Sequence, residues 1–182
     1  GQEGYDVAFN YLSNHDMAQD TLEKLKALGG NPLCYQCDMR DGQAVRAMAE
    51  RVLEAYGHLD LLVNNAGVTR YLPFLEATEE LWEDITRTDW KSAYFLTQQV
   101  ARNMVATGTK GVVINITSIH QSCCFPISNI YGPTKAALLK FTEHAALELA
   151  AYGIRVIAMS PGCISIRPIQ GESARGKALA GR

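Results

Sequence analysis

The sequence has 182 residues, of which 47% are hydrophobic and 20% are charged, and its 17 basic and 19 acidic side chains give a formal net charge of −2. This length fits one domain, residues 1–182. The apolar content excludes a disordered chain, and the near-neutral charge argues against a nucleic-acid binder, which normally carries a basic excess. No apolar run approaches the roughly 20 residues that span a bilayer. We therefore expect a small-molecule ligand, with neither nucleic acid nor a membrane as partner.

The cysteines form an odd set without the spacing of a disulfide framework, and the chain starts without the features of a signal peptide. They are Cys34, Cys37, Cys123, Cys124 and Cys163. Both features favour a reducing, cytoplasmic setting. Cys34 and Cys37 have the spacing of a redox or zinc motif, but they lie in a strand-like run and lack a second ligand pair. We interpret them as strand residues and expect no metal site.

Short apolar, β-branched runs alternate along the chain with longer helical patterns. The runs predict strands at Asp6–Tyr11, Pro32–Cys37, Leu59–Val63, Gly111–Ile116 and Arg155–Met159. The longer patterns predict helices at Asp16–Leu28, Gln43–Tyr56, Glu79–Ala106 and Tyr131–Tyr152, three of them followed by C-cap glycines at Gly29, Gly57 and Gly153. A bend between Trp82 and Trp90 would divide the third helix into two. Such alternation is typical of βαβ units, so we expect an α/β fold with a doubly wound parallel sheet.

In open sheets of this kind, ligands bind beyond the carboxyl ends of the strands. The segments there are Cys37–Met39, Asn64–Gly67, Thr117–Ser118 and Ser160–Gly162. Each of these segments alone also has residues that are common in ordinary turns. Their shared position at the strand ends is what predicts a binding site.

Tyr131 and Lys135 are four residues apart at the start of the last predicted helix, so they share one of its faces. A tyrosine that transfers protons near neutral pH needs its phenol pKa lowered from about 10, and a nearby ammonium favours the phenolate. Alone, such a pair is more often a surface lysine lying along an aromatic ring. Ser118 follows a buried-looking strand, 13 residues before Tyr131, and its hydroxyl could bind the same substrate oxygen. The three groups suit hydride transfer, which needs a hydride carrier that no side chain can provide and a nicotinamide can.

These residues, taken together, resemble the short-chain dehydrogenase/reductase family in their order and spacing, from about Gly4 to Gly162. The motifs are Asn64–Gly67, Ser118, Tyr131, Lys135, Ile154–Val156 and Ser160–Gly162. The resemblance implies a Rossmann-like fold, with Tyr131 as general acid/base and Ser118 positioning the substrate oxygen. It also implies that Lys135 lowers the pKa of Tyr131 and binds the nicotinamide ribose.

The resemblance further implies where a dinucleotide would lie. It places Asp38 and Met39 near the adenine, Asn65, Ala66 and Gly67 along the cofactor, and Pro161, Gly162 and Ile164 on the nicotinamide side. Cofactor preference is set after the first predicted strand, where an acid pairs with a ribose 2′-hydroxyl and a base with a 2′-phosphate. The residues from Asn10 to Ser13 include neither, and the missing acid favours NADP over NAD.

The sequence departs from the family at Asp89, where the family has an asparagine that holds a helix kink and a water through its main-chain carbonyl. Asp89 keeps that carbonyl, so we count it with the catalytic residues. Its carboxylate near Lys135 would stabilise the ammonium and compete for it, which weakens the effect of Lys135 on Tyr131. We therefore expect a reduced proton relay. Ile157 also replaces an asparagine, but it lies within a strand.

The family's glycine-rich phosphate turn, the strand before it and the last strand have no counterpart in this sequence. Without the turn, a pyrophosphate loses the backbone N–H cradle at a helix N-terminus. Either the sequence is part of a longer enzyme, or the chain is a truncated homologue that holds no dinucleotide. Removing a central strand would leave backbone groups unpaired at about 1–3 kcal/mol each if buried, so we expect part of a longer enzyme.

We expect an oxidoreductase that moves hydride between NADP or NAD and a ketone or secondary alcohol. Thr69–Phe74 and His120–Ile130 are expected on the substrate side, with His120, Gln121 and Phe125 as the candidate contacts. One alternative is a non-catalytic nucleotide-binding or regulatory homologue. Another is a sugar-nucleotide epimerase or dehydratase, which also uses a tyrosine and a lysine.

Two helical segments, Trp90–Ala106 and Pro133–Leu149, are apolar on more than one face. A helix that covers only one face of a sheet does not need this. We therefore expect a homodimer or homotetramer.

Overall fold

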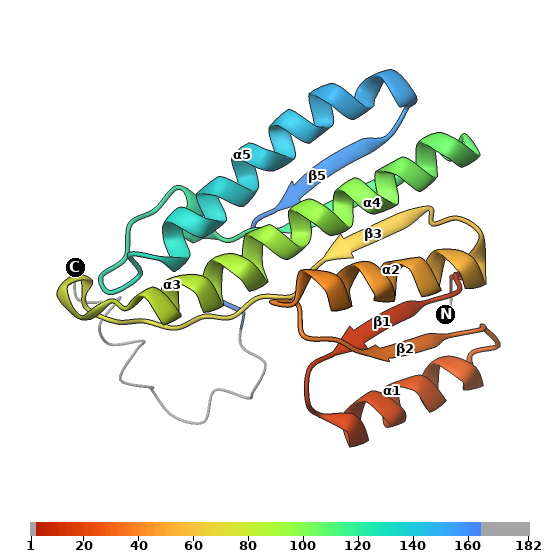
Figure 1. Ribbon diagram of the computed structural model, residues 1–182, viewed down its shortest axis with the longest axis horizontal. Helices are drawn as coiled ribbons and strands as arrows, with labels where there is room; N and C mark the ends of the chain where they lie inside the picture. Colours follow the sequence, from red (N-terminus) through yellow and green to blue (C-terminus); the bar gives the residue numbers. More distant parts are fainter. Residues whose placement is uncertain (1–2, 165–182) are drawn as a thin grey trace.

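Five parallel strands and the helices between them form the computed structural model, which describes residues 3–164 (Figure 1). In chain order they are β1 (Ala8–Tyr11), α1 (His15–Ala27), β2 (Leu33–Gln36), α2 (Gly42–Tyr56), β3 (Leu61–Asn64), η1 (Phe74–Glu76), α3 (Glu79–Thr86), η2 (Arg87–Lys91), α4 (Ser92–Thr107), β4 (Val112–Ile116), η3 (Ile119–Gln121), α5 (Tyr131–Leu149), η4 (Ala150–Tyr152) and β5 (Arg155–Met159). This is the predicted alternation, so the α/β fold is confirmed. The prediction that the last strand is missing concerns residues beyond Ile164, outside the described part.

The strands form two hydrogen-bonded sets. β1 pairs with β2, and β3, β4 and β5 form a second sheet in that order. The register places Ala8 opposite Leu33 in the first set, and Val113 opposite Leu62 and Val156 in the second. All the pairs are parallel, so the carboxyl ends of β3, β4 and β5 meet at one edge of their sheet, which is the edge that the sequence predicted to carry the site.

The long third helical pattern is interrupted, as predicted. α3 ends at Thr86, η2 is a turn of π-helix, and α4 begins at Ser92. A π-turn widens the helix locally and changes which side chains face the core. Here it buries Thr88 and Asp89, while their neighbours Arg87 and Trp90 stay exposed.

The core lies between one face of the sheet and the helices α2, α4 and α5. Its fully buried side chains include Val45 of α2, Val100 and Met104 of α4, and Ile154 before β5. Each contributes about 1.5–3 kcal/mol by leaving water. This packing holds the helices against the strands. It therefore also holds in place the sheet edge that carries the predicted site residues.

The other face of the second sheet is open within residues 3–164. Side chains alternate between the two faces of a strand, and those on this face are large and apolar. They are Leu61 and Val63 of β3 and Ile157 and Met159 of β5, between 42% and 52% exposed. Ile157, which replaces the family's asparagine, therefore lies away from the covered core. No helix in the described residues is long and apolar enough to cross a membrane.

Candidate active site

The N-terminus of α5 carries Tyr131 and Lys135 one turn apart, as predicted. The turn is anchored by Thr134, whose N–H and hydroxyl both donate to the carbonyl of Ile130. Pro133 is tolerated in this first turn because its missing N–H would have no helical partner there. The Nζ of Lys135 lies 5.5 Å from the centre of the Tyr131 ring. The structure thus brings a phenol and an ammonium together at the start of one helix.

Lys135 is buried beside the end of β4. Its Nζ donates to the carbonyl of Ile116 at 3.1 Å and lies 3.1 Å from Oδ2 of Asp89. Only 5% of its side chain is exposed. Within residues 3–164 the ammonium thus makes one hydrogen bond, to the Ile116 carbonyl, and an ion pair with Asp89, whose Oδ2 has no hydrogen-bond partner there.

Asp89 reaches the same place from the π-turn η2. Its other carboxylate oxygen, Oδ1, accepts the backbone N–H of Val68 at 2.8 Å. Burial raises the pKa of Asp89, while the Lys135 ammonium and the Val68 N–H oppose the rise. The sequence predicted that a carboxylate here would meet Lys135, and the geometry agrees.

The loop after β3 passes close to this ion pair. A Cβ added to Gly67 would lie 3.0 Å from Oδ2 of Asp89 and 3.4 Å from Nζ of Lys135. Real Cβ atoms rarely approach other atoms so closely, so a side chain at Gly67 would displace the pair. Of the predicted cofactor residues in this loop, Asn65 and Gly67 are exposed, and Ala66 is half-buried.

Ser118 follows β4 and is buried, and it caps the short helix η3 by accepting the N–H of His120 on its hydroxyl. The next residue, Ile119, donates its N–H to the carbonyl of Pro161. These bonds tie the Ser118 segment to the loop after β5. Two of the predicted strand-end segments, those after β4 and β5, are thereby joined. Gly162 and Ile164 are exposed at the end of the described residues.

An aromatic cluster surrounds Tyr131 and includes two of the predicted substrate-side residues. The His120 ring lies 5.2 Å from that of Tyr131 and stacks on Phe125 at 4.3 Å. Tyr71 lies 6.2 Å from His120 and 6.4 Å from Tyr131. Nδ1 of His120 shares a hydrogen bond with Oγ of Ser128, and burial lowers the pKa of His120. The ring beside Tyr131 is therefore neutral at physiological pH.

A cavity of about 620 Å³ opens behind this cluster. His120, Gln121 and Phe125 line it, together with Pro133 and other residues of the same loop and helix. Tyr131 and Ser118 are not among its lining residues, so the cavity adjoins these two predicted site residues without including them. Oε1 of Gln121 is buried and has no hydrogen-bond partner among the described residues.

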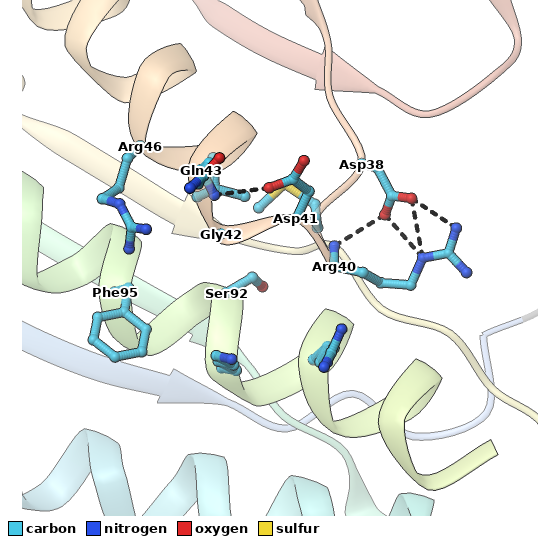
Figure 2. A pocket seen from close by; sticks show the side chains of 12 residues that line it. Asp38, Arg40, Asp41, Gly42, Gln43, Arg46, Ser92 and Phe95 are labelled. Carbon is cyan, nitrogen blue, oxygen red and sulfur yellow. Dashed lines mark hydrogen bonds and ion pairs between the residues drawn. The ribbon is translucent and has the colours of Figure 1, made fainter. Parts of the chain in front are cut away.

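A second hollow of about 520 Å³ lies between α2 and α4, next to the predicted adenine residues (Figure 2). Asp38 and Met39 line it, and Figure 2 shows Arg46 of α2 and Phe95 of α4 on opposite sides of it. That Asp38 and Met39 border an adenine stays a prediction.

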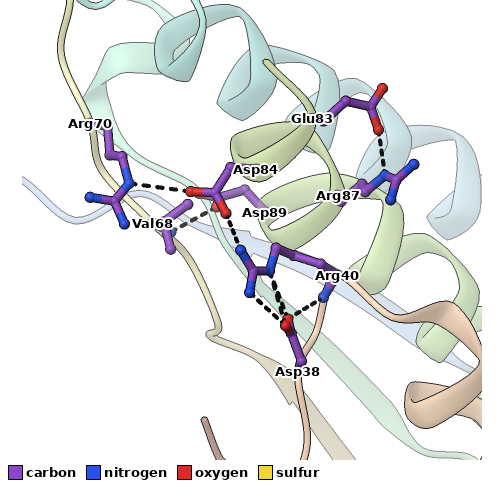
Figure 3. A network of polar contacts seen from close by, with 8 residues as sticks. All are labelled: Asp38, Arg40, Val68, Arg70, Glu83, Asp84, Arg87 and Asp89. Carbon is purple, nitrogen blue, oxygen red and sulfur yellow. Dashed lines mark hydrogen bonds and ion pairs between the residues drawn. The ribbon is translucent and has the colours of Figure 1, made fainter. Parts of the chain in front are cut away.

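The Asp38 carboxylate is held by a residue that the sequence did not single out. Arg40 donates to both oxygens of Asp38, at 2.6–3.0 Å, and its other terminal nitrogen reaches Asp84 of α3 at 2.9 Å (Figure 3). Asp84 also pairs with Arg70. The hydrogen bonds from Arg40 lower the pKa of Asp38. An adenine amino group would therefore share Asp38 with Arg40.

The carboxyl end of β1 carries no acid, as the sequence indicated. Asn10 pairs with Tyr35 of β2, and the Tyr11 hydroxyl lies 2.7 Å from Nδ1 of His15. The carbonyl of Leu12 accepts the side-chain amide of Gln36. His15, which the sequence analysis did not single out, is a further candidate for contact with a ribose or phosphate at this position.

A buried chain of polar side chains supports the site from within. Nδ2 of Asn64 donates to Oγ1 of Thr97 at 2.9 Å and to Oδ1 of Asn115 at 2.7 Å. Nδ2 of Asn115 donates in turn to Oγ1 of Thr142 at 2.8 Å. The chain joins the ends of β3 and β4 to α4 and α5. It therefore fixes both the loop that begins at Asn65 and the strand end beside Lys135.

Comparison with known proteins identifies the family. The family model for short chain dehydrogenases matches residues 1–177. A 3-oxoacyl-[acyl-carrier-protein] reductase of Staphylococcus aureus is 36% identical over 163 residues, which are 90% of this chain and 66% of the relative. An oxidoreductase of Escherichia coli is 34% identical over 164 residues, 90% of this chain and 65% of the relative.

Solved structures show the same similarity. An acetoin dehydrogenase from Enterobacter cloacae superposes with a TM-score of 0.86 at 34% identity, covering 90% of this chain and 65% of that one. An acetoin dehydrogenase from Salmonella typhimurium gives 0.87 at 30% identity, covering 95% and 68%. The chain thus spans about two thirds of the length of its relatives, and the motifs at the strand ends lie within the shared part. It belongs to the short-chain dehydrogenase family.

Proposed function

We propose that the protein transfers hydride between a nicotinamide dinucleotide and a ketone or secondary alcohol. The observation that carries this proposal is the meeting of Tyr131 with the buried ammonium of Lys135, close to the end of β4 where Ser118 follows. Tyr131 donates the proton to the substrate oxygen in reduction and takes it back in oxidation. Ser118 orients that oxygen by a hydrogen bond, and Lys135 favours the phenolate through its charge.

The residues at this edge fit the nicotinamide ribose end of such a cofactor. Lys135 donates one hydrogen bond, to the Ile116 carbonyl, and a side chain at Gly67 would crowd its Nζ, since an added Cβ would lie 3.4 Å away. A bound nicotinamide would supply or accept the hydride. Asn65, Ala66 and Gly67 would lie along the cofactor, and Pro161, Gly162 and Ile164 would lie on the nicotinamide side. Asp38 and Met39 would border the adenine, and Asn10 the adenosine ribose.

The aromatic cluster and the names of relatives both support a ketone substrate. Tyr71, His120 and Phe125 carry no charge near Tyr131, so this wall favours an uncharged, moderately apolar group. The relatives include a 3-oxoacyl reductase and acetoin dehydrogenases. The five cysteines, all within the described residues, are unpaired, which supports a cytoplasmic location.

The test is a direct assay of the full-length protein with NADPH or NADH and a panel of ketones. The reaction is monitored through the absorbance of the reduced nicotinamide. Cofactor binding is measured in parallel by fluorescence. Ketone-dependent oxidation supports the proposal. Binding without turnover on any ketone would instead support the non-catalytic homologue.

Cofactor preference gives a prediction at Leu12. We propose NADP as the preferred cofactor because the end of β1 presents no acid to a 2′-phosphate. Leu12 is 53% exposed, so the variant Leu12→Asp places a carboxylate there at little cost to the core. The ratio of kcat/KM for NADP to that for NAD is expected to fall by about tenfold or more, equivalent to 1.4 kcal/mol. Leu12→Asn is the uncharged control, and an equal fall in both variants would contradict the argument.

Association gives a second prediction. We propose that α4 and α5 pair with a second copy of the chain, since they expose a connected aromatic surface. Tyr94 lies 5.1 Å from Phe95 and 4.8 Å from Phe141, and the Tyr94 and Phe95 side chains are about 40% exposed. The variant Tyr94→Glu is expected to weaken the dimer or tetramer about 30-fold or more, the size of an interface hot spot of 2 kcal/mol. Analytical ultracentrifugation measures this, with Met17→Glu on exposed α1 as control. A wild-type protein that is monomeric at micromolar concentration would exclude the interface.

A further inference from the structure

Asp89 and Lys135 form an ion pair from which water is excluded. The carboxylate oxygen and the ammonium nitrogen are 3.1 Å apart, and the side chains are 0% and 5% exposed. Charges buried in this way interact much more strongly than a surface pair, because little solvent screens them. The electrostatic effect of Lys135 on neighbouring groups therefore depends strongly on the opposite charge of Asp89.

Tyr131 experiences both charges. Nζ of Lys135 lies 5.5 Å from the centre of its ring, and Oδ2 of Asp89 lies 3.1 Å from the same nitrogen. At such a separation the carboxylate offsets a large part of the attraction that the ammonium exerts on a phenolate. An unpaired lysine in the same place would favour the phenolate more.

The carboxylate is held firmly enough to act in this way. Its second oxygen accepts the N–H of Val68 at 2.8 Å (Figure 3), and the bare backbone of Gly67 packs against the pair. An asparagine would keep an acceptor oxygen for the Val68 N–H, but it would carry no negative charge beside Lys135. Oδ1 of Asp89 is therefore held by a hydrogen bond, whereas Oδ2 acts on Lys135 through its charge.

We propose that Asp89 is a positioning residue that tunes the acid/base step, since its carboxylate fixes Lys135 and cancels part of the ammonium's field at Tyr131. The inference rests on the proposed role of Tyr131. In consequence, removing the charge of Asp89 is expected to favour the phenolate of Tyr131, which is the form that takes up the proton in alcohol oxidation.

Other titratable groups near Tyr131 do not supply the same charge. His120 of η3 is neutral at physiological pH because burial lowers its pKa, and Tyr71 contacts Tyr131 through its ring. Asp84 of α3 is the next carboxylate, and it is paired with Arg40 and Arg70. Asp89 is thus the carboxylate in contact with Lys135 in the described residues.

The test reads the ionisation of Tyr131 without needing turnover. Tyrosine is labelled with ¹³C at the ring carbon that bears the hydroxyl, and the Tyr131 signal is assigned by its loss in Tyr131→Phe. The cofactor-free protein is then titrated by NMR. In Asp89→Asn, where Lys135 keeps its contact with the Ile116 carbonyl, the midpoint of Tyr131 is expected about one pH unit lower than in the wild type. An unchanged or higher midpoint overturns the proposal.

Two further variants sharpen the result. Asp84→Asn removes a carboxylate without contact to Lys135 and is expected to leave the midpoint unchanged. The double variant Asp89→Asn/Lys135→Met removes both buried charges, so it tests the proposal even if Asp89→Asn folds poorly. The Asp89–Lys135 pair is neutral as a whole. The titration midpoint of Tyr131 in the double variant is therefore expected within about half a pH unit of that in the wild type. A rise of more than one unit in the double variant would show that Lys135 acts without compensation.

The pH dependence of turnover separates this inference from the proposed function. If the ketone assay works, the alkaline rise of alcohol oxidation is expected to move to lower pH in Asp89→Asn, in step with the NMR midpoint. If no ketone is reduced, the proposed function fails, and the titration still decides whether Asp89 controls the charge at Tyr131.

Discussion

Replacing Tyr131 by phenylalanine is expected to lower kcat by 10²- to 10⁴-fold or more, the usual contribution of a positioned acid/base group. The substitution removes one oxygen, and the Tyr131 hydroxyl makes no hydrogen bond within residues 3–164 that its loss would break. The ring contacts with His120 and Tyr71 remain. The fold and the cofactor affinity should therefore be unchanged while the proton transfer is lost.

The measurement compares kcat with the cofactor dissociation constant in the same preparation. Tyr152→Phe, on the exposed turn η4, removes a phenol elsewhere and is expected to retain full activity. A Tyr131→Phe enzyme with more than a tenth of the wild-type kcat would refute Tyr131 as the acid/base. Lost cofactor binding would instead point to a structural role for the hydroxyl.

Replacing Asn115 by leucine is expected to lower the free energy of unfolding by about 2–4 kcal/mol, because it leaves buried polar partners unsatisfied. Asn115 is fully buried and bonds to Asn64 on one side and Thr142 on the other. Water cannot replace these bonds without opening the core between the sheet and α5. Urea unfolding followed by circular dichroism measures the change.

A double variant distinguishes the loss of hydrogen bonds from a packing effect. Asn64→Leu/Asn115→Leu removes both members of one bond, so its cost should be smaller than the sum of the two single costs. Gln19→Leu, on the exposed surface of α1, is expected to change the free energy by less than about 0.5 kcal/mol. A cost for Asn115→Leu no larger than that control would show that the buried chain contributes nothing to stability.

Local sequence patterns predicted the features that depend on neighbours in the chain. The alternation of strands and helices, the pairing of Tyr131 with Lys135 on one helix face and the interruption before Trp90 all follow from periodicity over a few residues. The strands are shorter than predicted, since Asp6, Val7 and Pro32 lie outside β1 and β2. Proline cannot donate to a ladder, which makes the start of β2 at Leu33 understandable.

Features that depend on distant partners could not be predicted in this way. Arg40 reaches Asp84, 44 residues away, and Asn64 reaches Asn115, 51 residues away. Periodicity tells which face of an element is buried, but not which polar group will meet it there. The approach of Tyr71 to His120 likewise needs the loop after β3 to fold over η3. The contact of Asp89 with Lys135 could be anticipated only because the resemblance placed them in one site.

The open sheet face has a consequence for the stability of the protein. Leu61, Val63, Ile157 and Met159 remain about half exposed within residues 3–164. Covering them completely would contribute on the order of 1 kcal/mol for each side chain, about half of its full burial. That sum is comparable with the entire margin by which many domains remain folded. Solubility and thermal midpoint should therefore respond strongly to whatever packs on this face, even though it lies opposite the helices that carry Tyr131 and Asp89.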